Sequence, residues 1–250
     1  MKSMPNVKIS RQDFERLITQ NRYGSGGEGV ICTTPSPHTL YKIFVEYETS
    51  IPVIMSDNKR KKIQELYHRH IEHSTQPLST ISLDGELIGY EMTGDQDDIS
   101  LLSIHLPRRK KIEVLKRSSE ILQYFASQGI TYGDVKANNI LVNRKTNQVK
   151  FCDMDNIKLD DYPIDLLNDY VDSIIESESD INPSVDAYMH NLMTLQLLNS
   201  PGITYDEIIY KLIDGKYHKK YKQEAHRALS TMVSSEQPFT GEYIAPYIKR

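Results

Sequence analysis

The hydrophobic pattern of the chain changes near residue 92, and this change constrains the fold more than any other feature. Before that point, apolar residues form short runs, at 30–32, 40–45, 78–83 and 86–92, separated by glycines and turn residues. After it they recur at helical spacing, most clearly over 108–128, and Gly129 ends that segment. The pattern predicts an α+β protein with a small antiparallel sheet in residues 1–92 and a mainly helical part in residues 93–250.

Helix signals can be placed within the first part. Ser10 is a suitable cap for a short helix with an apolar stripe of Phe14, Leu17 and Ile18. A longer helix is expected to begin near Ser56 and to be the one helix that the sheet carries. Its buried stripe is expected to contain Ile63, Leu66, Tyr67 and Ile71, and the basic run at 59–62 is expected to be its solvent-facing side. Asp84-Gly85 predicts a hairpin turn between two strands.

The second part contains strand signals at 140–142 and 149–152, joined by a turn at 145–147. Pro183 opens a helix that is apolar nearly all round, as is typical of an interior helix. Two further helices are expected around 205–213 and 221–233. The stretch 153–180 is acidic and has no strong periodicity.

The overall composition excludes several classes of protein. The chain has 250 residues, a net charge of -4 and no apolar stretch of bilayer length. We therefore expect a cytoplasmic protein with no general attraction to nucleic acid or membranes. Cys32 and Cys152 both follow apolar residues and are expected to be buried thiols, not a disulfide.

The stretch 132–155 has the residues that phosphoryl transfer requires. Asp134 is followed by Lys136 and Asn139, then by two strand signals, and then by Asp153. An Asp can orient an attacking hydroxyl, and an amide and a second carboxylate can hold Mg²⁺. A nearby Lys can offset charge that develops on the transferred phosphoryl group. Four suitable residues at this spacing make the stretch the strongest functional signal in the chain.

These residues resemble the protein-kinase superfamily. The resemblance implies a two-lobed fold that binds ATP and Mg²⁺, with the smaller lobe in 1–92 and the larger in 93–250. It implies that Asp134 and Lys136 are catalytic and that Asn139 and Asp153 bind metal. Asp186 resembles the residue that anchors the catalytic loop in this family.

The resemblance extends into the first part of the chain. Gly24, Gly26 and Gly29 match the phosphate-covering glycine loop, and Ile31 lies at an apolar position of the same motif. Lys42 matches the strand lysine that grips the phosphates, and Glu65 is the best candidate for its helix partner. Adenine is expected near Glu91 and Met92, in the segment 91–94, bonded to backbone groups.

The sequence also departs from the family pattern. Tyr132 and Gly133 stand where protein kinases have His and Arg, so switching by an activation-loop phosphate is not expected. Asp155 replaces the glycine of Asp-Phe-Gly, and it is either a further metal ligand or a solvated or capping residue. The most favoured function is a Ser/Thr-type kinase with a protein substrate. The alternatives are a small-molecule or lipid kinase of the aminoglycoside or choline kinase type, and a nucleotide-binding pseudokinase scaffold.

Overall fold

The computed structural model describes residues 3–26, 28–46, 48–160, 162–164, 181–199, 202–214, 229, 232 and 241–248. The chain divides into two compact units: unit 1 is Met1–Asp98 with Asn143–Lys145, and unit 2 is Ile99–Val142 with Thr146–Arg250. Both helices and strands are present, which confirms the α+β class. The division between residues 92 and 93 stays a prediction.

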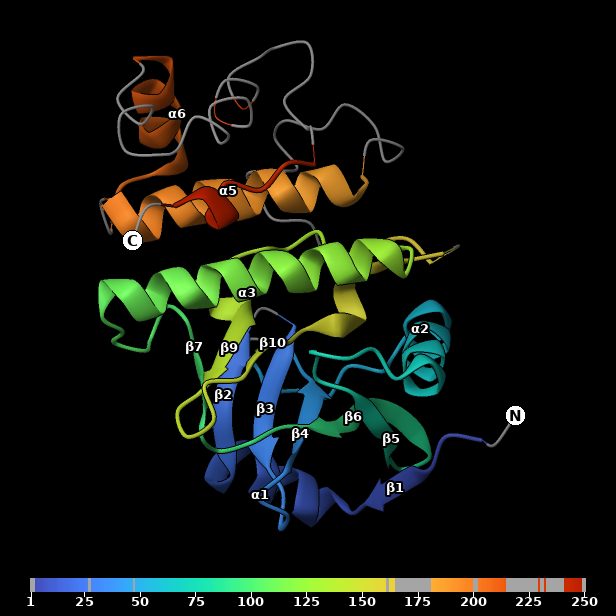
Figure 1. The fold of residues 1–250 in the computed structure, drawn as a ribbon. Coiled ribbons are helices and arrows are strands. Elements are labelled where there is room, and N and C mark those ends of the chain that lie inside the picture. Colours follow the sequence, from blue (N-terminus) through green and yellow to red (C-terminus); the bar gives the residue numbers. More distant parts are fainter. Residues whose placement is uncertain are drawn as a thin grey trace. The chain divides into compact units, whose positions relative to one another are not determined.

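Unit 1 is built on a six-stranded sheet with the strand order β1-β5-β6-β4-β3-β2. Its elements are β1 (Asn6–Ile9), α1 (Arg11–Gln20), β2 (Arg22–Gly26), β3 (Gly29–Thr33), β4 (Thr39–Phe44), α2 (Asp57–Arg69), β5 (Pro77–Leu83) and β6 (Glu86–Thr93). The sheet is mostly antiparallel, and the prediction of an antiparallel sheet that carries one helix needs two corrections. Strand β1 pairs with β5 in parallel, and both α1 and α2 pack on the sheet (Figure 1). A four-residue strand such as β1 is too short to show a clear hydrophobic period.

Local sequence signals explain most of these elements. The hydroxyl of Ser10 accepts from the Asp13 N–H at 3.1 Å, and the Asp13 carboxylate accepts from the Ser10 N–H at 3.3 Å, which closes a capping box. Ser56 caps α2 in the same way, through the N–H of Lys59 at 3.2 Å. Asp84 and Gly85 both have positive φ, as a tight turn between β5 and β6 requires.

The two helices cover opposite faces of the sheet. Phe14 of α1 packs in a core cluster with Ile43 and Ile81, whereas Ile63 of α2 packs with Leu40 and Phe44. Residues 43 and 44 are adjacent on β4, and their side chains point to opposite faces because a strand has a period of two. The face that holds Phe44 is therefore the one that α2 covers.

One prediction about α2 is wrong. The basic run 59–62 was expected to face solvent, but Lys62 is fully buried and the side chain of Lys59 is 12% exposed. Lys61 is the exposed lysine of this run. Charge alone did not reveal which side of the helix packs on the sheet.

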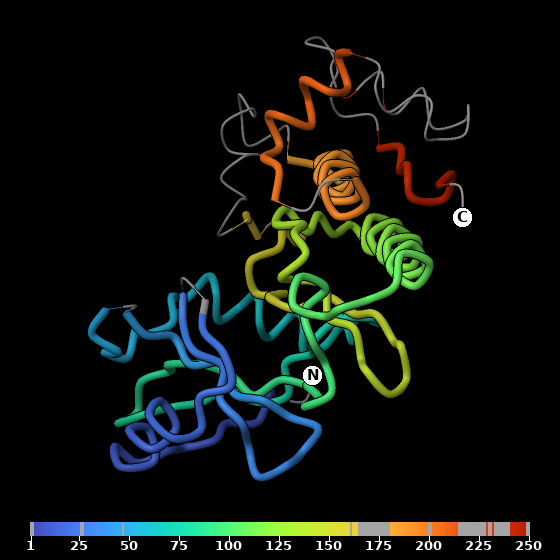
Figure 2. The backbone as a smooth tube through the Cα atoms, turned by 90° about the vertical axis from the view of Figure 1, so that its left-hand side faces the viewer, coloured from blue at the N-terminus to red at the C-terminus, as the bar shows by residue number. Residues whose placement is uncertain are grey.

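Unit 2 is organised around two long helices. Its elements are β7 (Asp98–Ser100), α3 (Arg108–Ser127), β8 (Ile130–Thr131), η1 (Ala137–Asn139), β9 (Ile140–Asn143), β10 (Val149–Phe151), η2 (Met154–Asn156), β11 (Lys158–Leu159), α5 (Pro183–Asn199), α6 (Tyr205–Ile213) and η6 (Ala245–Tyr247). Strands β7 and β9 run across the points where the chain passes from one unit to the other. Figures 1 and 2 show α3 and α5 side by side.

Helix α5 is the interior helix expected from its composition. Every residue from 185 to 195 is buried. Most of the predicted helix at 221–233 and most of the acidic stretch 153–180 lie outside the described residues. Within the described part of the chain, no helix is long and apolar enough to cross a bilayer.

The two cysteines are both free, as predicted. Cys32 is buried, and burial raises the pKa of its thiol to about 11. Cys152 is only partly buried, which corrects the expectation of two interior thiols. Cys152 follows Phe151, the last residue of β10, and directly precedes Asp153.

Candidate functional site

The carboxylate of Asp134 has two different surroundings in unit 2. Its Oδ2 accepts a hydrogen bond from Asn139 Nδ2 at 2.8 Å and forms an ion pair with Lys136 Nζ at 2.6 Å. Its Oδ1 is buried and accepts no hydrogen bond from any described residue. A buried acceptor without a donor is costly, so such an atom in a folded protein calls for an explanation.

The structure thus brings together three of the residues predicted from the sequence: Asp134, Lys136 and Asn139. Asn139 lies in η1, and its Nδ2 donates both to Asp134 Oδ2 and to the Asp134 carbonyl oxygen at 3.0 Å. Because the amide nitrogen is engaged in this way, the amide oxygen is the Asn139 atom that remains suited to a cation. Lys136 is 38% exposed at its side chain, so it can reach a ligand from the surface.

Asp186 holds the backbone on the N-terminal side of Asp134. From the first turn of α5, its two carboxylate oxygens accept from the N–H groups of Tyr132 and Gly133, each at 2.7 Å. This is the anchoring contact that the resemblance implied. Gly133 has φ +78°, a conformation that suits glycine. Burial raises the pKa of Asp186 to about 7, although the two N–H donors act in the opposite direction.

Tyr132 connects this loop to the segment that carries Asp153. Its ring packs against Phe125 and Phe151, and its hydroxyl donates to the Cys152 carbonyl oxygen at 2.5 Å. Burial raises the pKa of Tyr132 well above its ordinary value, so the phenol stays protonated and remains a donor. The sequence showed only that Tyr132 replaces the usual residue; it did not show this contact.

The ends of β9 and β10 place Asn139 next to the candidate metal ligand Asp153. Ile140 is paired with Phe151, and beyond this pair the Cys152 N–H donates to the Asn139 carbonyl oxygen at 3.1 Å. Asp153 follows with φ +54°, a left-handed conformation that costs energy for any residue with a Cβ. Strain of this kind gathers at functional sites, because surrounding structure must hold it in place.

The donors fit Mg²⁺ binding as far as the described residues go. Mg²⁺ often takes only one or two protein carboxylates together with water and substrate phosphates. Asn139 has an amide oxygen and Asp153 a carboxylate, which are the kinds of donor that would hold Mg²⁺. The described residues contain no group of three or more His, Cys, Asp or Glu arranged to hold a metal. Asp155 lies in η2 and is 1% exposed, so the alternative that it is a solvated residue is wrong, and its role as a metal ligand stays a prediction.

Tyr205, the first residue of α6, is a member of this neighbourhood that the sequence did not reveal. The pKa of its phenol is raised by burial and, to a smaller extent, by the negative charge of Asp134. Helix α6 packs on α5, whose first turn holds the Asp134 loop. No sequence signal places residue 205 near residue 134, because the approach depends on the packing of two helices.

In unit 1, most of the predicted nucleotide-binding residues lie on one face of the sheet. Gly24 is opposite Ile31, Ile31 is opposite Lys42, and Lys42 is opposite Tyr90, which forms a row across four strands. Gly26, Gly29 and Phe44 form the next row on the same face. Met92 also lies on this face, in the core cluster with Leu40.

The packing of the sheet requires glycine at position 29 of the hairpin but not at position 24. A Cβ on Gly29 would lie 2.3 Å from the carbonyl oxygen of Ile43, so the approach of β3 to β4 requires glycine there. A Cβ on Gly24 would meet nothing within 4 Å. The need for Gly29 is therefore explained by the sheet itself, whereas Gly24 is open to a ligand.

Part of the backbone of residues 91–94, where adenine was expected to bind, already forms hydrogen bonds within the chain. Glu91 lies on the opposite face of β6 from Met92, and its carboxylate accepts from the Ser79 hydroxyl at 2.9 Å. The N–H of Thr93 donates to Gln76 and that of Gly94 donates to His38, both to carbonyl oxygens. These two donors are thus engaged within the chain, and a base bound at 91–94 would have to use other groups.

The predicted partner of Lys42 forms a different ion pair. Glu65 pairs with Arg69 one turn along α2, with Nε and Oε1 2.8 Å apart. Another residue of α2, Lys59, contacts the hairpin between β2 and β3. Its Nζ lies 3.1 Å and 3.0 Å from the two carboxylate oxygens of Glu28 in the hairpin turn. The role of Glu65 as partner of Lys42 stays a prediction without support from this contact.

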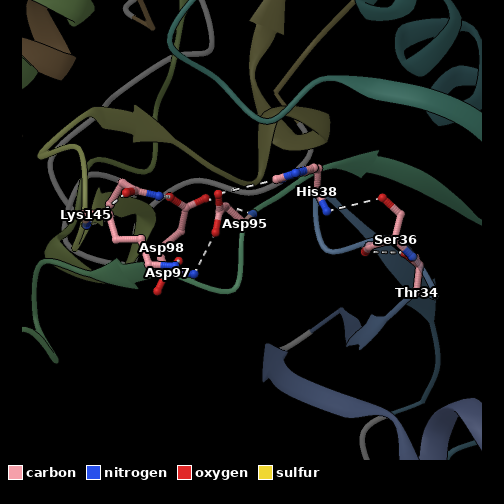
Figure 3. Close-up of polar contacts among 8 residues, drawn as sticks. Thr34, Ser36, His38, Asp95, Asp97, Asp98 and Lys145 are labelled. Carbon is pink, nitrogen blue, oxygen red and sulfur yellow. Dashed lines mark hydrogen bonds and ion pairs between the residues drawn. The ribbon is translucent and has the colours of Figure 1, made fainter.

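Several polar side chains of unit 1 interact in the turn that follows β6, and Figure 3 shows them in close-up. Asp95 Oδ1 accepts from the Asp97 N–H at 2.8 Å, and Asp98 Oδ2 accepts from the Asp95 N–H at 3.0 Å. Lys145 pairs with Asp97 at 2.5 Å, and His38 lies 3.9 Å from an Asp95 oxygen. These carboxylates bind the turn to its own backbone and neighbours, which is a structural role.

Comparisons with known proteins do not identify a family for this chain. No protein-family model matches the chain, and a search of curated proteins finds no match.

Proposed function

We propose that this protein is an ATP- and Mg²⁺-dependent phosphotransferase with a protein-kinase-like fold that acts on a hydroxyl, as a Ser/Thr-type protein kinase does. The observation that carries the proposal is the Asp134 carboxylate. One oxygen is fixed by Asn139 and Lys136, and the other is buried with no donor among the described residues. An acceptor hydroxyl is the kind of group that would satisfy it.

In this proposal Asp134 Oδ1 accepts the hydrogen bond of the attacking hydroxyl and takes its proton as the phosphate is transferred. Asn139 and Lys136 hold the carboxylate through Oδ2, so Oδ1 stays oriented. Asp186 fixes the loop backbone and Tyr132 fixes the segment before Asp153. Mg²⁺ bound by Asn139 and Asp153 would neutralise charge on the triphosphate.

The residues of unit 1 would hold the nucleotide. The row of Gly24, Ile31 and Lys42 offers an open backbone, an apolar side chain and a cation on one face. An adenosine triphosphate needs these three kinds of contact: apolar surface for the base, and backbone and a cation for the phosphates.

The test is phosphate transfer from labelled ATP with Mg²⁺, to mixed proteins and to a panel of aminoglycosides, choline and lipids. We expect label on Ser and Thr of protein, and losses of about 10²- to 10⁴-fold in Asp134→Asn, as for removal of a general base. Asp153→Asn should lose transfer as well. Glu113→Gln, which changes an exposed carboxylate of α3, is the control and should keep full activity.

Other outcomes separate the alternatives. Transfer to small molecules alone would identify a small-molecule kinase. If ATP raises the melting temperature while transfer and hydrolysis stay at the level of Asp134→Asn, the chain is a nucleotide-binding scaffold, and the proposed catalysis is wrong.

A further inference from the structure

Two lysines of unit 1 share one aromatic ring. The Nζ of Lys42 lies 5.6 Å from the ring centroid of Phe44, and the Nζ of Lys59 lies 4.8 Å from it. Lys42 is 4% exposed and the Lys59 side chain is 12% exposed. Two cations repel each other more strongly in a buried place than on the surface, and an anion close to them stabilises such an arrangement.

Glu28 is an anion that Lys59 contacts in this structure. Its two carboxylate oxygens lie 3.1 Å and 3.0 Å from Lys59 Nζ, and its side chain is 28% exposed. Glu28 belongs to the turn between β2 and β3, beside Gly29. Lys59 lies in the first turn of α2, where a cation opposes the helix dipole and a carboxylate nearby offsets that cost.

Lys59 reaches the same face of the sheet as the predicted phosphate-binding residues. Phe44 is opposite Gly29 and lies two residues from Lys42 on β4, so both side chains point to the face that α2 covers. Lys42 approaches this ring from the strand and Lys59 from the helix. The Glu28 carboxylate therefore contacts one of two cations that lie on this face, and cations suit a polyphosphate.

We propose that Lys59 is a second phosphate-binding lysine of the nucleotide site, held by Glu28 until the phosphates of a nucleoside triphosphate replace that carboxylate. The inference rests on the proposed function, since it takes ATP as the ligand of this face. It assigns opposite effects to the two partners of one ion pair: Lys59 favours the nucleotide, and Glu28 competes with it.

Equilibrium binding of ATP, ADP and adenosine to the full chain tests the proposal. Lys59→Gln should weaken ATP binding by at least about tenfold, as for loss of a charge-assisted bond, and change adenosine binding less than twofold. Glu28→Gln should strengthen ATP binding several-fold, and the double variant should show no such gain. Lys61→Gln, the same change at the exposed lysine of α2, is the control and should bind like wild type.

Three different results would overturn the inference. If Lys59→Gln and Glu28→Gln weaken ATP binding alike and lower the melting temperature alike, the pair only holds α2 against the hairpin. Unchanged ATP binding by Lys59→Gln would also refute it, while the proposed function stands. A wild-type chain that binds no ATP would refute both.

Discussion

The hydroxyl of Tyr132 donates to the carbonyl oxygen of Cys152 at 2.5 Å, inside unit 2. The backbone N–H of the same Tyr132 donates to Asp186. One residue thus joins the helix that anchors the Asp134 loop to the backbone that immediately precedes Asp153. The backbone and the side chain of one residue therefore contact both the anchor of the candidate base and the residue before the candidate metal ligand.

Tyr132→Phe removes this hydrogen bond and keeps the ring between its aromatic neighbours. We expect a loss of about 1–2 kcal/mol in the free energy of unfolding, because a partly buried carbonyl loses its donor. If Tyr132 positions Asp153, the variant also needs more Mg²⁺ for half-maximal phosphate transfer. Urea unfolding and a Mg²⁺ titration of activity measure the two effects. Tyr210→Phe, at a tyrosine that is 71% exposed, should change neither. Lower stability with an unchanged Mg²⁺ requirement would show that the bond is only structural.

Two buried groups on α5 give stability opposite dependences on pH. The pKa of Asp186 is raised to about 7, so between about pH 4 and 7 the folded chain binds more protons than the unfolded chain. Its contribution to stability is therefore lost as pH rises through that range. Burial lowers the pKa of His190 to about 3, so its contribution is lost as pH falls below about 6.5.

We therefore expect the pH dependences that Asp186 and His190 give to the free energy of unfolding to offset each other between about pH 4 and 6.5. Relative to wild type, the free energy of unfolding of Asp186→Asn should rise with pH, and that of His190→Gln should fall with pH. Each difference is at most about 1.4 kcal/mol per pH unit. Urea unfolding at several pH values measures it, with the wild-type curve as control. Curves that run parallel to wild type would contradict the assignment.

Gly24 and Gly29 provide a matched pair of substitutions. Gly29→Ala places a Cβ 2.3 Å from a backbone oxygen, and we expect it to lower stability by about 1–3 kcal/mol. Gly24→Ala meets open space and should stay within about 0.5 kcal/mol of wild type. Gly24→Ala is the substitution that tests ATP binding. We expect it to weaken ATP binding, because the added methyl group lies on the same face of the sheet as Ile31 and Lys42. Thermal unfolding and ATP titration separate the effects, and unchanged ATP affinity in Gly24→Ala would count against this face as the phosphate site.

The backbone at Asp153 predicts a difference between two charge-removing variants. Asp153→Ala should be less stable than Asp153→Asn by about 1 kcal/mol, since Asn adopts the left-handed region more readily than Ala. Both variants should lose phosphate transfer equally, because each removes the carboxylate. Unfolding and transfer measured on the same preparations check this. Equal stability would mean that the conformation relaxes in the variants.

Much of the fold follows from local sequence. The capping residues Ser10 and Ser56, the Asp84-Gly85 turn and the interior character of α5 all predict the observed elements, because caps, turns and hydrophobic periods act over a few residues. The parallel pairing of β1 was missed because pairing with β5 is a long-range choice. The prediction that residues 59–62 of α2 face solvent was wrong, because a run of cations does not show which of them packs against the sheet.

For the candidate site, the sequence pointed to Asp134, Lys136, Asn139 and Asp153. The structure brings the first three into contact because they are close together in the chain, and the role of Asp153 stays a prediction. Tertiary structure alone decided the rest: the buried Asp134 oxygen without a donor among the described residues, the bond from Tyr132 to Cys152, and the ion pair of Lys59 with Glu28 in the hairpin. Those contacts join segments far apart in sequence. Their geometry depends on how helices and strands pack, which no local pattern specifies.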